Sequence, residues 1–333
     1  MWALFMPTFV FSEISITVYD YEDLKGWSQD RHEDALEAFL ETCPDLDAED
    51  WKSLCAKAQY FENAQLFFEA FFLPVKITDG TPGKFTGYYE PELSASRYQS
   101  DRFRYPIYKM PDEARGQTPW KTRREIGEGP ILRDYVIAWA EDPVDLMYLQ
   151  IQGSGRLKLE EGGFIRLGYS GSNGHDFKSI GTELVRQGIY EPHQASQRVI
   201  KNWVKRNPID GKELIYHNPS YVFFREVTEV PPSKGPQGAM NRSLTPLRSI
   251  AIDPSYVPLG APVWIEKQGV PAMNRLMIAQ DTGSVIKGAQ RADVFFGFGQ
   301  AAGQKAGKLK DKGSLFVLLP SKRALALLPE RTK

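Results

Sequence analysis

The chain has 333 residues, of which 42% are hydrophobic and 12% aromatic, as in globular proteins with a large core. Its 41 Lys and Arg residues nearly balance 42 Asp and Glu residues, and no block of like charge occurs, which excludes a surface built for nucleic acid or an anionic membrane. A neutral partner fits better, and the length favours about two domains over one.

The N-terminal stretch MWALFMPTFVFSEIS is an apolar run that no basic segment precedes and no small-residue cleavage site follows. It is a poor match to a signal peptide and is too short to span a membrane. Two interpretations stay open for it, a remnant of an incorrectly placed start codon and a first β-strand.

Residues 31–72 carry two runs of apolar side chains at helical spacing. Pro44 and Asp47, a chain break and a helix N-cap, separate the runs, so we expect a small helical hairpin. The two cysteines of the chain, Cys43 and Cys55, exclude a Cys-rich zinc or iron–sulfur site. Their spacing fits a local disulfide in an exported protein, and it fits equally two free core thiols.

After residue 83 the pattern changes to short strand-like runs bounded by Gly and Pro. These runs are KFTGYYEPEL, DYVIAWAED and VDLMYLQIQGSGRLKLEEGGFIRLGYSG. A helical island follows. Its first segment is capped by Asp176 and continues through Val185, and its second ends at Asn207 and Pro208.

The Pro- and Gly-rich stretch 230–238 predicts a connection between two lobes. Every strong signal beyond it is a strand again: LRSIAIDPSYVPLGAPVWIE, NRLMIAQDTG, RADVFFGFG and GSLFVLLP. One small Ala/Gly helix is expected near residues 300–307. The C-terminal part is therefore expected to form a compact barrel of short strands.

Three aspartates accompany these strand-like runs: Asp253 after SIAI, Asp281 after LMIAQ and Asp293 before VFF. An aspartate at the edge of a buried strand is costly unless it is hydrogen-bonded or functional. Asp253 precedes Pro254, and Asp281 precedes a Thr-Gly pair. A structural Asx turn is therefore as good an interpretation as a site role for these two residues.

Asp293 differs because no Gly or Pro beside it can form a turn. Val294, Phe295 and Phe296 follow it, and among such side chains desolvation disfavours the ionised form of a carboxyl group. This environment keeps a carboxylic acid protonated near neutral pH, as general-acid catalysis requires. Arg291 would oppose the effect if its guanidinium reached the carboxyl.

Asp253, DTGSVIKG (281–288) and Asp293, with IDPSYVPLGAPVWI upstream, resemble the three-aspartate (3D) domain of the membrane-bound lytic murein transglycosylase A family. The preceding part resembles the body of the same family, through segments in the same order: FTGYYEPEL (85–93), YPIYKMP (105–111), QGSGRL (152–157), GYSGSNGHDFKSIG (168–181) and NPSYVFF (218–224).

The resemblance implies a mainly β enzyme with N-terminal helices. A double-psi β-barrel would be formed by segments on both sides of an inserted, smaller β-barrel-like domain, with a glycan groove between the two domains. We expect residues 1–100 to hold the helical hairpin and the first barrel strands. Residues 101–230 would form the inserted domain with its helical segment, and residues 231–325 the rest of the barrel with the catalytic aspartate.

The family cleaves the β-1,4 bond between N-acetylmuramic acid and N-acetylglucosamine in peptidoglycan without water and leaves a 1,6-anhydromuramyl end. The resemblance therefore implies a lyase, a peptidoglycan lytic exotransglycosylase. Its catalytic aspartate falls on Asp293, which would act first as acid and then as base, and Asp281, Asp253 and Lys287 would support the site. The residues implied to bind substrate are Thr86, Tyr88, Tyr89, Glu90, Gln152, Ser154, Ser170 and Asn173. Gly87, Gly153 and Gly155 would let the backbone approach a sugar closely.

We expect no cofactor and no metal, because the four histidines are scattered and the serine loops lack a paired His and Asp. The implied partners are peptidoglycan glycan strands, bound by a monomer in the periplasm or cell envelope. No Cys follows the N-terminal apolar run to carry a lipid anchor. Association with the outer membrane, the export route and docking on wall-synthesis proteins stay open.

Three other functions compete with this interpretation. A hydrolytic glycosidase of the same fold would use a second carboxylate. An aspartic protease is suggested by Asp281-Thr282-Gly283, but no second such triplet exists in the chain to complete the dyad. The third is a non-catalytic glycan-binding module.

Overall fold

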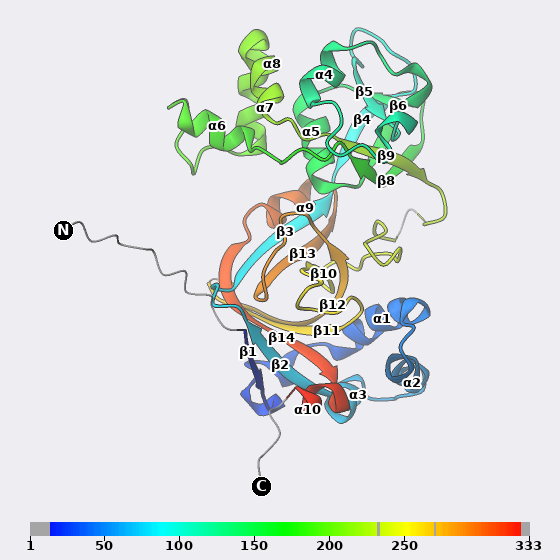
Figure 1. Ribbon diagram of the computed structural model, residues 1–333, viewed down its shortest axis with the longest axis vertical. Coiled ribbons are helices and arrows are strands. Elements are labelled where there is room, and N and C mark those ends of the chain that lie inside the picture. Colours follow the sequence, from blue (N-terminus) through cyan, green and yellow to red (C-terminus); the bar gives the residue numbers. More distant parts are fainter. Residues whose placement is uncertain (1–13, 232–233, 270, 328–333) are drawn as a thin grey trace, which may run out of the picture. The chain divides into compact units, whose positions relative to one another are not determined.

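The computed structural model describes residues 14–231, 234–269 and 271–327, so most of the N-terminal apolar run lies outside the described residues. The chain divides into two compact units (Figure 1). The first comprises Met1–Tyr88, Gln237–Gly297 and Gln304–Lys333, and the second comprises Tyr89–Pro236 and Phe298–Gly303. The boundary at 236/237 falls in the predicted connection. In the structure, the second unit begins at residue 89.

A six-stranded closed β-barrel forms the core of the first unit. Its strands run in the order β14-β11-β12-β10-β13-β3, and a further pairing of β14 with β3 closes the ring. Two more strands, β1 and β2, extend the sheet beside β14. The bounds are β1 Ser15–Val18, β2 Phe72–Thr78, β3 Lys84–Glu90, β10 Ser249–Ile252, β11 Pro262–Lys267, β12 Met273–Thr282, β13 Arg291–Phe298 and β14 Lys310–Pro320.

Strands β10 and β11 and the central part of β12 are near-continuous apolar runs because both of their faces are covered. One face fills the barrel, and helices cover part of the other. Trp264 of β11, Phe295 of β13 and Phe85 of β3 are fully buried. β10 lies parallel to β12 and antiparallel to β13, so it is paired on both sides.

The N-terminal part forms three helices rather than the predicted hairpin: α1 His32–Thr42, α2 Glu49–Ala58 and α3 Ala64–Phe71. Ala48 is the N-cap of α2, so the prediction of Asp47 was wrong by one residue. The side chain of Asn63 caps α3 by accepting a hydrogen bond from the Leu66 amide at 3.0 Å. Phe39, Phe67 and other rings join these helices to the barrel core.

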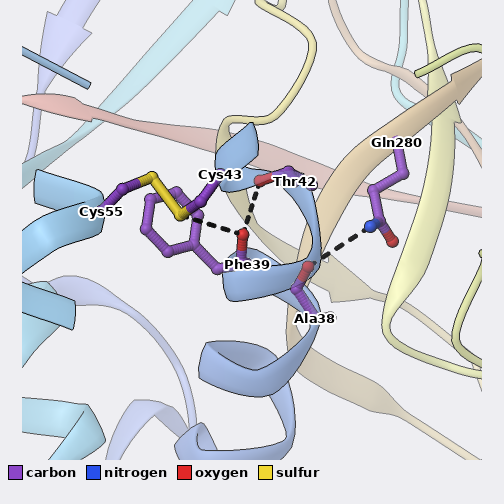
Figure 2. The surroundings of a disulfide bond; sticks show 6 residues. All are labelled: Ala38, Phe39, Thr42, Cys43, Cys55 and Gln280. Atoms are coloured by element: carbon purple, nitrogen blue, oxygen red, sulfur yellow. Dashed lines mark hydrogen bonds between the residues drawn. A yellow bond between two sulfur atoms is a disulfide. The ribbon is translucent and has the colours of Figure 1, made fainter. Parts of the chain in front are cut away.

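Cys43 and Cys55 form a disulfide, with their Cα atoms 5.6 Å apart, so the first of the two alternatives left by the sequence is confirmed. The bridge ties the end of α1 to α2 (Figure 2). In the same view the backbone carbonyl of Ala38 on α1 accepts a 3.3 Å hydrogen bond from the side chain of Gln280 on β12. The disulfide therefore holds the helix that contacts a barrel strand.

The second unit contains a six-stranded sheet in the order β5-β6-β4-β7-β8-β9. A bridge between Lys109 and Phe224 brings its two edges together, so this barrel is nearly closed. Its strands are β4 Glu92–Ser96, β5 Tyr105–Tyr108, β6 Val136–Ala140, β7 Gly155–Leu159, β8 Phe164–Ser172 and β9 Val222–Val227. The predicted mainly β fold with N-terminal helices and an inserted, smaller barrel-like domain is confirmed.

Several helices differ from the sequence expectation. Residues 143–152, taken as part of a strand run, form α5, because Asp142 caps the helix through the amides of Val144 and Asp145 and Pro143 occupies the first turn. Ser179, rather than Asp176, caps α6. The remaining helices are α4 Arg123–Glu128, α6 Ile180–Arg186, α7 Gln197–Arg206, α8 Pro208–His217, α9 Gly299–Ala306 and α10 Ser321–Ala326. The small helix expected near residues 300–307 is confirmed as α9. Within the described ranges, no helix has both the length and the apolar character needed to cross a bilayer.

Replacing both cysteines by alanine is expected to lower the free energy of unfolding by about 2–4 kcal/mol, because the bridge restricts the unfolded chain. Urea denaturation of the oxidised parent and of the Cys43→Ala/Cys55→Ala variant measures this difference. Reductant should destabilise the parent by a similar amount and leave the variant unchanged. Equal midpoints for parent and variant would contradict the stabilising role.

Candidate active site

Two of the three aspartates flank the central strand β10 at the same level of the barrel. Ala251 of β10 pairs with Asp293 of β13 on one side and with Asp281 of β12 on the other. Neighbouring strands lie about 4.8 Å apart, so the Cα atoms of the two aspartates are separated by about 10 Å. The parallel β10–β12 pairing, which requires a crossover, brings together residues 30 positions apart in sequence.

Asp293 is partly exposed and belongs to the middle of β13. Its Oδ1 accepts a hydrogen bond of 2.6 Å from the Thr86 hydroxyl on the neighbouring strand β3. Burial raises the pKa of the Asp293 carboxyl, and neither the Thr86 hydrogen bond nor the charge of Arg291, both of which favour the ionised form, reverses the direction. The pKa of this carboxyl is therefore shifted in the direction that general-acid catalysis favours.

Arg291 lies two residues before Asp293 on β13, and its guanidinium reaches strand β3 without contacting the carboxyl directly. One of its nitrogens donates to the Thr86 hydroxyl at 2.7 Å, and another donates to the carbonyl of Lys84 at 3.2 Å. The sequence correctly raised Arg291 as an opposing charge. It gave no sign that a hydroxyl would lie between the two groups.

Asp281 is held by three donors of the first unit. Tyr88 donates from its hydroxyl to Oδ2 at 2.8 Å, and the amides of Ala239 and Thr282 each donate to Oδ1 at 2.9 Å. Burial raises the pKa of Asp281 to about 6, against the lowering effect of these hydrogen bonds, and the charge of Asp293 adds to the rise. The Tyr88 ring also packs against Phe295, at 5.3 Å between centroids.

Asp253 follows β10 and shapes the turn before β13. Its Oδ2 accepts from the Gly288 amide at 2.9 Å, and its Oδ1 accepts from the Ser255 amide at 3.1 Å. Burial acts to raise the pKa of Asp253, but these hydrogen bonds outweigh it and the pKa is lowered. Lys287 is largely exposed, with its ammonium 3.9 Å from Asp253. Asp253 is thus an ionised structural carboxylate, in agreement with the Asx-turn interpretation.

Gln280 is a residue that the sequence analysis missed. The pairing of β10 with β12 shifts register between Ile250 and Ala251, which leaves Gln280 as an extra residue on β12 directly before Asp281. Such a bulge redirects the side chains that follow it. The Gln280 side chain is fully buried, accepts from the Ser249 hydroxyl and donates to Ala38 of α1. A polar residue inside an apolar run, beside a candidate aspartate, was the available signal.

In the second unit, Glu90 and Asn173, both predicted to contact substrate, are buried and hydrogen-bonded to other protein groups. Glu90 is fully buried, and its carboxylate accepts from Arg156 at 2.8 Å and from Arg166 at 3.0 Å. Asn173 is also fully buried, and it bonds backbone groups of Lys121, Pro219 and Tyr221. Burial raises the pKa of Glu90, against the charges of the two arginines.

Four other predicted substrate-binding residues of this unit remain partly exposed. The Gln152 side chain accepts from the Tyr89 amide at 3.1 Å, so these two lie together. Ser154 lies directly before β7. Ser170 is the extra residue at a bulge of β8, where the register with β9 shifts between Tyr169 and Gly171. Bulges are frequent next to functional sites.

The three glycines predicted to allow close approach of a sugar also have structural reasons to be glycine. A Cβ at Gly87 would lie 2.7 Å from the Phe296 ring and 2.8 Å from the backbone of Ala306. A Cβ at Gly155 would lie 2.2 Å from the Leu149 side chain. Gly153 ends α5 with φ +76, which glycine adopts without strain. Among the described residues, no group of three or more His, Cys, Asp or Glu side chains is arranged to hold a metal ion.

Both parts of the chain are similar to known protein families. A family model described as the MltA specific insert domain matches residues 84–225, and one described as the 3D domain matches residues 248–319. The membrane-bound lytic murein transglycosylase A of Escherichia coli (strain K12) is 34% identical over 248 residues, which cover 71% of this chain and 65% of that protein. The match thus spans less than two thirds of that relative's length.

Solved structures align over nearly the whole chain. The crystal structure of MltA from Neisseria gonorrhoeae (monoclinic form) is 34% identical, with a TM-score of 0.81 and coverage of 92% of this chain and 93% of that one. The crystal structure of E. coli MltA with bound chitohexaose is 25% identical, with a TM-score of 0.75 and coverage of 93% and 96%.

Asp281→Asn is expected to stabilise the protein at neutral pH. The pKa of Asp281 is higher in the folded protein than the ordinary 3.8, so its contribution to stability is complete below about pH 4 and is lost as the pH rises through about 6. An amide cannot ionise. Its oxygen can keep the two hydrogen bonds from Ala239 and Thr282, and its nitrogen can donate to the Tyr88 hydroxyl in place of the bond that Tyr88 now donates. The rise from 3.8 to about 6 limits the gain to about 3 kcal/mol.

Urea unfolding at pH 4 and at pH 7.5 tests this prediction. The variant should gain on the parent between the two values, while Asp47→Asn, whose carboxylate is 94% exposed, should show no comparable change. A difference between Asp281→Asn and the parent that does not depend on pH would show that Asp281 titrates as an ordinary aspartate.

Proposed function

Because the chain belongs to the membrane-bound lytic murein transglycosylase A family, we propose that it is a lytic transglycosylase of peptidoglycan. It would cleave the β-1,4 bond between N-acetylmuramic acid and N-acetylglucosamine without water and leave a 1,6-anhydromuramyl end. The E. coli relative whose structure contains chitohexaose supports an oligosaccharide substrate.

The observation that carries the proposal is the state of Asp293. It combines partial exposure, which lets a substrate reach it, with enough burial to raise its pKa. Its Oδ1 is bonded to Thr86, and no described residue donates to its Oδ2. A carboxyl of this kind holds a proton that it can give to a substrate oxygen.

The reaction would proceed in two proton transfers through one carboxyl. Protonated Asp293 donates its proton to the glycosidic oxygen as the bond from that oxygen to C1 of the muramic acid breaks, and the ring passes through an oxocarbenium-like state. The resulting Asp293 carboxylate then takes the proton of the C6 hydroxyl while the C6 oxygen bonds to C1. Asp293 loses one proton and regains one, so no water is consumed and the carboxyl is protonated again at the end of the reaction.

A hydrolase would need a second carboxylate to activate water or to attack C1. Asp281 is the nearest candidate in the barrel, two strands from Asp293. Its oxygens, however, already accept hydrogen bonds from Tyr88, Ala239 and Thr282. A carboxylate held in this way favours a supporting role, so the transglycosylase is the better assignment.

We propose that Tyr88, Tyr89, Gln152, Ser154 and Ser170 contact substrate, because each of these residues is partly exposed. Thr86 is reassigned as the hydrogen-bond partner of Asp293. The disulfide between Cys43 and Cys55 supports an oxidising compartment such as the periplasm, which is also where peptidoglycan is accessible.

Asp293→Asn is expected to lower the rate at which soluble fragments are released from purified peptidoglycan by at least about 10²-fold, because an amide cannot transfer the proton. Mass spectrometry of the parent's products should show ends lighter by one water than hydrolytic products. Asp47→Asn serves as the matched control and should match the parent. Reducing ends from the parent would favour the hydrolase, and full activity of Asp293→Asn would remove the catalytic assignment.

A further inference from the structure

The guanidinium of Arg291 is half-buried in the barrel wall, but among the described residues it makes no ion pair with an Asp or Glu side chain. Its hydrogen-bond partners are the Thr86 hydroxyl and the carbonyls of Lys84 and Ala292. A charged group that loses water without a counter-ion is costly to keep. Burial lowers the pKa of Arg291, and the charge of Asp293, which acts in the opposite direction without a direct contact, does not reverse this. We therefore look for the role of Arg291 in the groups to which it donates hydrogen bonds.

The donors and acceptors around Thr86 permit one arrangement of its proton. Arg291 carries only donors, so the 2.7 Å contact places an Arg291 proton on the Thr86 oxygen. The oxygen keeps a second lone pair, but among the described residues the Thr86 hydroxyl makes no other hydrogen bond that could take its proton, so the proton is directed to Oδ1 of Asp293, at 2.6 Å. With Arg291 absent, the hydroxyl could also rotate to accept a proton from the carboxyl.

This arrangement distinguishes the two oxygens of Asp293. Oδ1 accepts from Thr86 and cannot at the same time point a proton at that hydroxyl. In the protonated acid, the proton therefore lies on Oδ2. The orientation is set before substrate binds, which is how preorganised sites reduce the cost of proton transfer.

We propose that Arg291 is a positioning residue that fixes Thr86 as a hydrogen-bond donor to Oδ1 of Asp293 and so reserves Oδ2 for the proton delivered to the glycosidic oxygen. The proposal rests on the proposed function and adds residues to it. Arg291 and Asp293 lie on the same side of β13, two residues apart, and Thr86 lies on the adjacent strand β3. We call these three side chains, Arg291, Thr86 and Asp293, the relay.

The test compares Arg291→Met, Thr86→Val and the double variant on soluble glycan strands from peptidoglycan. Each single change is expected to lower kcat about tenfold, the loss of one charge-assisted hydrogen bond, with KM little changed. The double variant should be no slower than Thr86→Val, because Arg291 acts through the hydroxyl. Both single changes remove an influence that favours ionised Asp293, so the basic limb of the pH–rate profile should move to higher pH.

Two conservative variants keep the test decisive if Arg291→Met does not fold. Thr86→Ser retains the hydroxyl and should approach the parent, and Arg291→Gln retains a donor to Thr86 and should recover part of the loss. As a matched control, Arg323→Met removes an arginine that pairs with Asp50 and should leave kcat and the pH profile unchanged.

Multiplicative losses in the double variant, a raised KM with unchanged kcat, or a parental pH profile in Arg291→Met would each overturn the relay. Parental activity of Arg291→Met and Arg291→Gln alongside an inactive Asp293→Asn would remove the relay alone. Activity in Asp293→Asn would remove the proposed function itself.

Discussion

Desolvation of one carboxyl group on strand β13 is the constraint on which the rest of the site depends. An aspartate in water is ionised at neutral pH and has no proton to give. The wall of the barrel changes this balance, because Val294 and Phe295 on either side of the pleat are fully buried and Asp293 between the strands is only partly hydrated. Thr86 and Arg291 limit the rise in pKa, which supports the proposed second role of the same group as a base.

Helix α1 and strand β10 support the strand that carries Asp281. Gln280, at the bulge before Asp281, is bonded to Ser249 of β10 and to α1, and α1 is bridged to α2 by the disulfide. The helical part of the first unit thus supports the strand whose end carries Asp281. This support offsets part of the stability that the buried Asp281 carboxyl costs at neutral pH. Proteins commonly accept such a loss of stability at functional sites.

The strand pattern of the barrel was predictable because each run is short, apolar and bounded by Gly or Pro. Asp293 could be distinguished from the other two aspartates because it has no turn residues beside it. The helix at 143–152 was not predictable, because its apolar residues and the following strand form one hydrophobic stretch in which only Asp142 and Pro143 mark a helix start. Glu90 illustrates a different limit. A carboxylate that binds substrate and one that pairs with buried arginines look the same in sequence, and only the positions of Arg156 and Arg166 distinguish them. The Thr86–Arg291 contact joins residues 205 positions apart, which no local pattern can reveal.

The central claim is that the fold raises the pKa of the Asp293 carboxyl, and the most direct measurement is its titration by ¹³C NMR in protein labelled at aspartate carboxyl carbons, with Asp293→Asn identifying the resonance. The account predicts a midpoint above that of ordinary aspartates. A midpoint at or below the ordinary value would contradict it.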